Sequence, residues 1–156
     1  MRGADDKQPT MYSLRTPEKA VPGDHPLRAI KKMADEALRA LGPTFDAMYS
    51  RHGRGSVPPE RLLKSILLMA LYSVRSERLF CEQLRYNLLF MWFLDMDADE
   101  EAFNHSSFSK NRPRLLEHEV AQKFFHKVVV ESLNRLADAE LQLSIVPRAE
   151  RGKTPT

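Results

Sequence analysis

The stretch HSSFSKNRPRL, His105 to Leu115, gathers serine, lysine, asparagine and arginine side chains around two apolar residues. Hydroxyl groups and helix-start amides bind phosphate oxygens, while arginine and asparagine side chains make paired hydrogen bonds to base edges. A solvated helix face needs charge, but it rarely needs this combination of side chains. The stretch therefore predicts a surface that binds double-stranded DNA.

The basic charge is concentrated in the same part of the chain. From His105 to Leu136 there are six lysines and arginines against three glutamates, and three of the six lie between Lys110 and Arg114. We expect the basic and amide side chains to approach the DNA and the serines to hold phosphates. The candidate DNA-binding residues are Ser106, Ser107, Ser109, Lys110, Asn111, Arg112 and Arg114.

Other side chains are of types that bind metal ions, but their arrangement disfavours a metal site. Five acids precede the stretch, namely Asp95, Asp97, Asp99, Glu100 and Glu101. A two-metal nuclease needs acids from separate rigid elements, whereas these crowd one loop without the glycine and spacing of a calcium loop. The residues His105, His118, His126 and Cys81 lack the short ligand spacing of zinc sites. We expect no metal site, no cofactor and no catalytic residue.

The elements that must position the stretch fit one small domain. The chain has 156 residues with 42% hydrophobic content and a formal charge of +3. The single cysteine, Cys81, cannot form an internal disulfide, which favours a reducing cytoplasm, and it lacks an activating motif, so we expect a small core residue. The longest apolar run, residues 88–94, is too short to cross a bilayer. We expect a cytoplasmic, nucleoid-associated protein without a membrane partner.

Helical periodicity dominates the chain. Residues 1–23 have prolines and no period, which predicts a flexible lead-in before a helical domain over 24–136. A helix is expected from an Asp24 cap to Gly42-Pro43, followed by a short helix, Thr44 to Ser50. Its apolar stripe comprises Leu27, Ile30, Ala34, Ala37, Leu38 and Leu41.

The next two helices are expected to form the centre of the domain. One begins at Pro59 and is apolar around most of its circumference, with Leu67 and Leu71 among its core residues. Ser76 is expected to cap the second, which runs from Glu77 to about Phe93. Its expected packing residues are Leu79, Phe80, Leu84, Leu88 and Trp92. The aromatic residues Phe90, Trp92 and Phe93 are able to stack on bases, but their apolar run favours core packing.

A polar loop over Asp95 to Asn104 leads into the basic stretch. Pro113 would cost about 3 kcal/mol inside a helix, so we expect it to open a final helix that ends near Leu136. A disordered tail is predicted over 137–156. The expected fold class is all-α, a compact helical bundle with flexible termini.

The order of these elements is typical of a helix-turn-helix variant. Two helices joined by a tight turn precede a short basic helix, which Phe108 holds against the core. The same pattern fits an ordinary helical bundle with a solvated basic face. In that case the DNA surface would lie elsewhere, around Arg51 and Arg54.

Three segments resemble the N-terminal domain of bacterial DDE transposases of the IS-five, InsH-like group. They are HPLRAI, VPPERLLKSILLMALYSVRSERLFCEQLRYNLLFMWFLDMD and HSSFSKNRPRLLEHEVAQKFF, within residues 22–130. The resemblance implies a helical domain that precedes an RNase H-like catalytic domain and recognises the element's terminal inverted repeats.

Three departures from the family pattern qualify this resemblance. Met91 stands where the family has an arginine, Pro113 directly follows Arg112, and the similarity fades after about Leu136, before the family's catalytic acids. The resemblance therefore implies a truncated, non-catalytic DNA-binding module. Alternatively, the chain associates with full-length transposase, or with itself, as a passive or inhibitory subunit.

Overall fold

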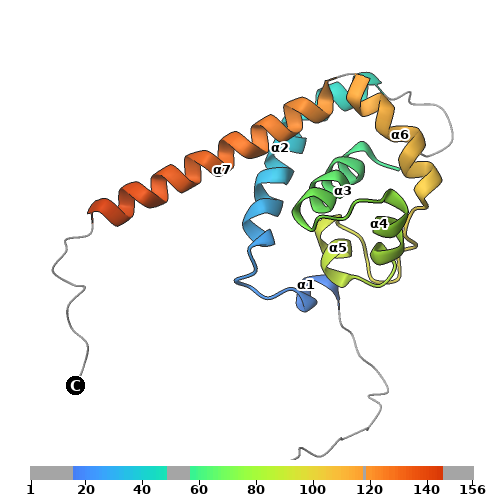
Figure 1. Ribbon diagram of the computed structural model, residues 1–156, viewed down its shortest axis with the longest axis horizontal. Coiled ribbons are helices and arrows are strands. Elements are labelled where there is room, and N and C mark those ends of the chain that lie inside the picture. Colours follow the sequence, from blue (N-terminus) through green and yellow to red (C-terminus); the bar gives the residue numbers. More distant parts are fainter. Residues whose placement is uncertain (1–15, 49–56, 118, 146–156) are drawn as a thin grey trace, which may run out of the picture.

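The computed structural model describes residues 16–48, 57–117 and 119–145, and it is all-α over these ranges (Figure 1). The helices are α1 (Pro17–Ala20), α2 (Leu27–Met48), α3 (Pro59–Leu71), α4 (Glu77–Leu84), α5 (Leu88–Phe93), α6 (His105–Glu117) and α7 (Val120–Ile145). The predicted all-α, compact fold is confirmed over these ranges. The alternative DNA surface around Arg51 and Arg54 lies outside the described residues, as do residues 1–15, 118 and 146–156.

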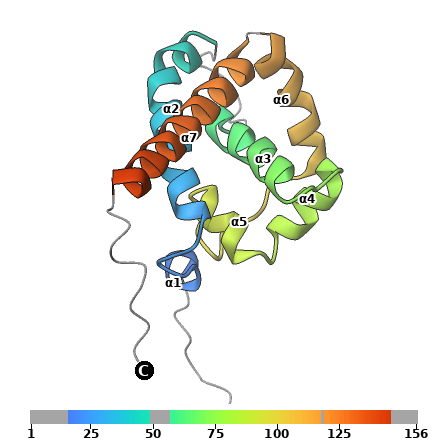
Figure 2. The same cartoon turned by 60° about the vertical axis from the view of Figure 1, so that its left-hand side comes forward.

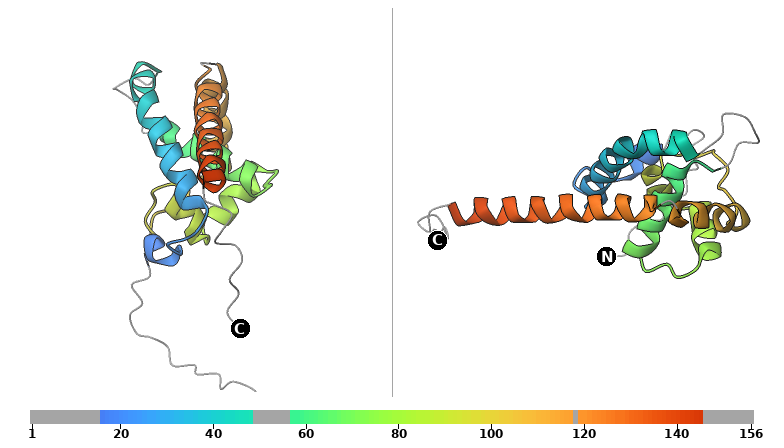
Figure 3. Two further views of the ribbon diagram at one scale, coloured as in Figure 1. Left: turned by 90° about the vertical axis from the view of Figure 1, so that its left-hand side faces the viewer. Right: turned by 90° about the horizontal axis from the view of Figure 1, so that it is seen from above.

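Helix α2 packs along α7, and α6 contacts α3, α4 and α7 (Figure 2). One continuous core joins these helices, and its largest fully buried side chains include Phe80, Phe90, Phe93, Phe108 and Phe124. The C-terminal part of α7 projects beyond the other helices (Figure 3). The molecule is therefore a packed body with one projecting helical arm.

Local signals explain where most helices begin and end. Ser76 Oγ accepts a hydrogen bond from Leu79 N at the start of α4, which confirms the predicted cap. Ser73 follows α3 and Asp95 follows α5, and both have a left-handed backbone conformation with positive φ. In both cases the amide of the next residue donates a hydrogen bond to the carbonyl five residues before it. This closure satisfies carbonyls at the helix end and turns the chain sharply.

The predicted break at Gly42-Pro43 is wrong, because α2 continues through both residues to Met48. Pro43 removes one helical hydrogen bond. The continuous helix offsets this loss by burying Phe45 one turn after Leu41 on the same face. The predicted Asp24 cap is also wrong: His25 Nδ1 accepts the hydrogen bond from Leu27 N at 3.2 Å.

The single helix predicted over Glu77 to Phe93 is divided in two. Asn87 Oδ1 accepts hydrogen bonds from Leu89 N and Phe90 N and so begins α5 as a new helix. This break buries all of Phe90, Met91, Trp92 and Phe93, which one continuous amphipathic helix would not do. Core packing of these aromatics is confirmed.

Two leucines predicted to lie in the core are largely exposed. Leu71 is 46% exposed and Leu79 is 43% exposed, whereas Leu67 is buried. Leu71 ends α3 and Leu79 lies in the first turn of α4, so both flank the tight turn at the edge of the body. Helical periodicity identifies a face, but not how far the neighbouring helix extends along it.

The predicted boundaries at the ends of the domain also shift. Residues 17–20 form α1, and Glu18 binds Arg28 and Trp92, so the folded part begins before residue 24. At the other end, α7 continues beyond Leu136 to Ile145. Pro113 lies inside α6 and does not open the final helix; the left-handed residue Glu119 separates α6 from α7. Leu115, fully buried, extends the buried face of α6 past the proline.

Candidate nucleic-acid interface

Helix α6 is fixed to the body through two buried side chains. Phe108 and Leu115 are both 0% exposed, and they lie two helical turns apart on one face. The Phe108 ring lies 6.0 Å from the Phe103 ring and 6.2 Å from the Phe80 ring, measured between centroids. Asn104 Oδ1 accepts a hydrogen bond from Ser107 N at 2.9 Å and caps the first turn. The opposite face of α6 is therefore held rigidly outward.

Three of the predicted residues form one exposed stripe along α6. Ser106, Lys110 and Arg114 are four residues apart and all exposed, so they lie on the same side of the helix. We call these three residues the α6 stripe. A hydroxyl and two cations at this spacing suit a run of phosphate oxygens.

Two other predicted residues face α4 and are engaged within the protein. Arg112 Nη1 lies 2.7 Å from Glu77 Oε1, and Ser109 Oγ donates a hydrogen bond to Glu77 Oε2. The Glu77 side chain is 18% exposed and the Arg112 side chain is 47% exposed. One carboxylate thus occupies both groups, and they lie beside the stripe without belonging to it.

The last two predicted residues are half-buried and bonded to each other. Asn111 Nδ2 donates to the Ser107 carbonyl oxygen at 2.7 Å, one turn earlier in α6. This bond occupies one donor of the amide and leaves its oxygen and second hydrogen for other partners. Asn111 is therefore less accessible to a base edge than the sequence suggested.

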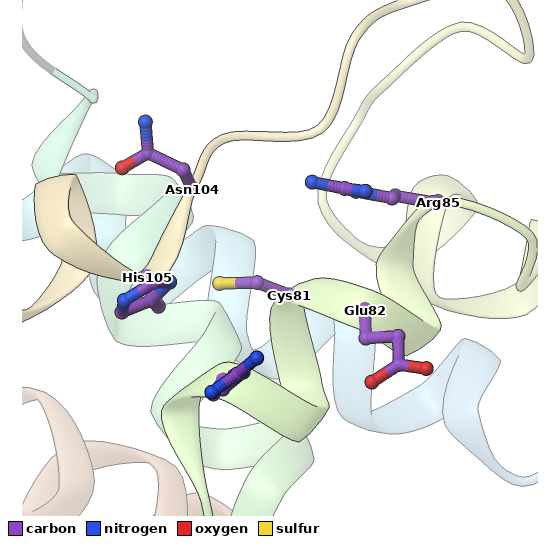
Figure 4. Close-up of a pocket in the computed structure, with 6 residues that line it drawn as sticks. Cys81, Glu82, Arg85, Asn104 and His105 are labelled. Atoms are coloured by element: carbon purple, nitrogen blue, oxygen red, sulfur yellow. The ribbon is translucent and has the colours of Figure 1, made fainter.

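A cavity of about 430 Å³ opens between α4 and the first turn of α6 (Figure 4). We call it the α4–α6 cavity, and its lining residues are Arg78, Cys81, Glu82, Arg85, Asn104 and His105. The sequence patterns assigned Arg78 and Arg85 no role. Their spacing of seven residues, close to two helical turns, is the signal that could have grouped them.

The buried thiol of Cys81 forms part of the cavity floor. Cys81 is 4% exposed, as predicted for a small core residue. Burial, helped by the nearby Glu77 carboxylate and opposed by Arg85, raises the pKa of the Cys81 thiol to about 11. The thiol is therefore protonated at neutral pH and contributes no negative charge.

The acidic loop is tied to the body by ion pairs. Lys64, which is 3% exposed, pairs with Asp35 and Asp95, and Lys31 pairs with the same two carboxylates. Burial alone raises the pKa of Asp95, but hydrogen bonds from Lys31 and Lys64 outweigh it and leave this pKa lowered.

Glu100, in the same loop, binds Arg61 through both carboxylate oxygens, and this bonding lowers the pKa of Glu100. Two of the five acids are thus engaged by lysines and arginine. His118 lies outside the described residues, and within the described ranges no group of three histidines, cysteines or acids is placed to hold a metal ion.

Met91, where the resembled family has an arginine, is 3% exposed inside the core. Its position therefore faces the interior and is not part of the exposed basic surface. None of the described helices is long and apolar enough to span a membrane.

Comparison with known proteins identifies a family match. Residues 15–114 match the family described as Transposase domain (DUF772). No curated protein and no solved structure matches the chain. The matched residues include α1 to α5 and α6 up to Arg114, and thus both the α6 stripe and the α4–α6 cavity.

Proposed function

Because the chain belongs to the transposase domain family DUF772, we propose that it is the DNA-binding module of an insertion-sequence transposase of the IS-five, InsH-like group. In this proposal α3 and α4 support α6, which enters the DNA groove at the element's terminal inverted repeats, as the last helix of a helix-turn-helix unit does. The observation that carries the proposal is the α6 stripe, held outward by the buried Phe108 and Leu115.

The charges on this surface favour DNA contact. Lys110 and Arg114 are exposed one turn apart, and Arg112 lies on the adjacent side of the same helix. Phosphate contacts position a protein on the duplex, whereas base contacts give specificity. We assign the first task to the α6 stripe and the second to Asn111, which must open towards the DNA to read a base.

We further propose that this domain has no catalytic activity of its own. The ion pairs of Asp95 and Glu100 give the acidic loop a structural task, since they join it to α2 and α3. The purified chain should neither nick nor join DNA with Mg²⁺ or Mn²⁺. Reproducible metal-dependent strand cleavage by the pure protein would overturn this part of the proposal.

The test of DNA binding removes the two cations of the α6 stripe. Lys110→Gln with Arg114→Gln should flatten the slope of log affinity against log salt by about 0.9 for each phosphate that is no longer neutralised. Anisotropy of a labelled inverted-repeat duplex measures the affinity. The matched control, Lys123→Gln with Lys127→Gln, removes the same charge from exposed positions on α7 and should leave the slope nearly unchanged. Equal slopes for both double variants and the wild type would exclude the α6 stripe as the DNA surface.

The alternative role, association with full-length transposase or with a second copy, is favoured by a different feature. Helix α7 exposes Val129, Val130 and Leu133, with Leu133 58% exposed. Exposed apolar groups on a projecting helix suit a protein partner. Subunit exchange with labelled full-length transposase, without DNA binding by the isolated chain, would support this role over the first.

A further inference from the structure

The α4–α6 cavity contains two arginines that no carboxylate of the described ranges engages. Other arginines of these ranges, including Arg28, Arg61, Arg112 and Arg135, bind carboxylates. Neither Arg78 nor Arg85 makes an ion pair or side-chain hydrogen bond to any residue that the structure describes. Two such guanidinium groups at one cavity are available to an external anion.

The geometry of α4 directs both groups to the same place. Arg78 and Arg85 are seven residues apart, so they project from one side of the helix, and both line the cavity. The planar fork of a guanidinium matches the oxygens of a phosphate in a bidentate manner. Asn104 and His105, from the start of α6, complete the lining with further polar groups (Figure 4).

One carboxylate opposes an anion in this cavity, that of Glu82. Figure 4 shows the Glu82 carboxylate directed away from Arg85 and Asn104. The Cys81 sulfur is directed towards His105 and carries no charge in its protonated form. The two arginines therefore outweigh the single glutamate, and the cavity is net positive.

We propose that the α4–α6 cavity binds one phosphate group between Arg78 and Arg85, and that this phosphate belongs to the backbone of bound duplex DNA. The assignment of this phosphate to DNA rests on the proposed function, whereas phosphate binding at the cavity does not. Asn104 and His105 immediately precede Ser106, the first residue of the α6 stripe. A duplex lying along the stripe therefore reaches the cavity at the N-terminal end of α6.

The test uses the full chain, two probes and two matched double variants. Arg78→Gln with Arg85→Gln removes the proposed ligands. Arg39→Gln with Lys127→Gln removes the same charge from exposed positions on α2 and α7. Inorganic phosphate is titrated by nuclear magnetic resonance, with amide shifts as the readout. A random 20-base-pair duplex is titrated by anisotropy at several salt concentrations.

We expect inorganic phosphate to shift amides of α4 and of the first turn of α6 in the wild type and in the control, but not in the arginine variant. The duplex slope should flatten by about 0.9 in the arginine variant, because one phosphate is no longer neutralised. Thermal unfolding checks that the variants fold. If the arginine variant were unfolded, the location of the amide shifts that phosphate causes in the wild type would decide whether phosphate binds at the α4–α6 cavity.

The two probes separate the two proposals. Phosphate shifts at the cavity without any duplex binding would show that the cavity takes a free phosphate group, and would overturn its assignment to DNA together with the proposed function. Duplex binding with the same slope in both variants, and no phosphate shifts at the cavity, would overturn the inference and leave the proposed function standing. Absence of both signals in the wild type would overturn both.

Discussion

Replacing Glu77 by glutamine should strengthen DNA binding, although it removes an ion pair that holds α4 and α6 together. The Glu77 carboxylate accepts from Arg112 Nη1 at 2.7 Å and from Ser109 Oγ. Glutamine keeps the size of the side chain but cannot form an ion pair. The Arg112 guanidinium is then released beside the α6 stripe, where it is able to contact a phosphate.

The size of the effect follows from the one cation released. One additional phosphate contact should steepen the slope of log affinity against log salt by about 0.9. Between 50 and 200 mM salt, this corresponds to a fall in affinity about 3.5-fold larger than that of the wild type. The stability cost should be small, about 0.5 to 1 kcal/mol, because the ion pair is partly exposed and Glu77 also faces the positive end of α4.

Anisotropy with a random duplex measures the slope, and thermal unfolding measures the stability. Glu60→Gln is the matched control, because it removes the same charge from the first turn of α3, where Glu60 has no ion pair with a described residue. Adding Arg112→Gln to Glu77→Gln should return the slope to that of the wild type. An unchanged or flatter slope in folded Glu77→Gln would refute the reasoning, since Arg112 would then lie away from the DNA.

Four further measurements test other parts of the structure. Asn111→Ala should weaken binding to the inverted repeat by about 1 to 3 kcal/mol with little change on random DNA or in the salt slope; equal weakening on both duplexes would contradict base reading. Lys64→Met should lower the free energy of unfolding by about 3 kcal/mol, because Asp35 and Asp95 lose a buried ion-pair partner. The loss should not be larger, because Lys31 still pairs with both carboxylates. Denaturant unfolding that showed no decrease would contradict the buried network. Leu67→Ala should cost about 2 to 5 kcal/mol and Leu71→Ala less than about 1 kcal/mol, so equal costs would mean that the two leucines are equally buried. Alkylation of Cys81 should accelerate about tenfold per pH unit between pH 8 and 10, because a thiol with a raised pKa is almost wholly protonated there; a rate that levels off below pH 9 would contradict the raised pKa.

Helical periodicity and capping residues predicted much of the fold. The stripe through Leu27 and Leu41 and the Ser76 cap are local signals, and the structure confirms both. The predictions made from the prolines were wrong for a physical reason. The cost of Pro43 or Pro113 is local and visible in the sequence, whereas the burial of Phe45 or Leu115 that offsets it depends on other helices.

The candidate site was predictable only in part. The exposed spacing of Ser106, Lys110 and Arg114 follows from helical geometry, once α6 is known to be one helix. The engagement of Arg112 by Glu77 joins residues 35 positions apart and depends on how α4 packs on α6. The grouping of Arg78 with His105 in one cavity has the same origin. Tertiary contacts of this kind leave no periodic trace in the sequence.

The packing of α7 on α2 has a consequence for the order in which the domain is completed during synthesis. Helix α2 leaves the ribosome early, but Val120, Ala121, Phe124 and Val128, which belong to the common core, are made last and lie beyond residue 114, where the family match ends. At about 5 to 20 residues per second, roughly 4 to 15 seconds separate the two helices. During this interval the apolar stripe of α2 lacks its cover from α7 and is a natural substrate for chaperones. A chain stopped at residue 114 would remain in this incomplete state.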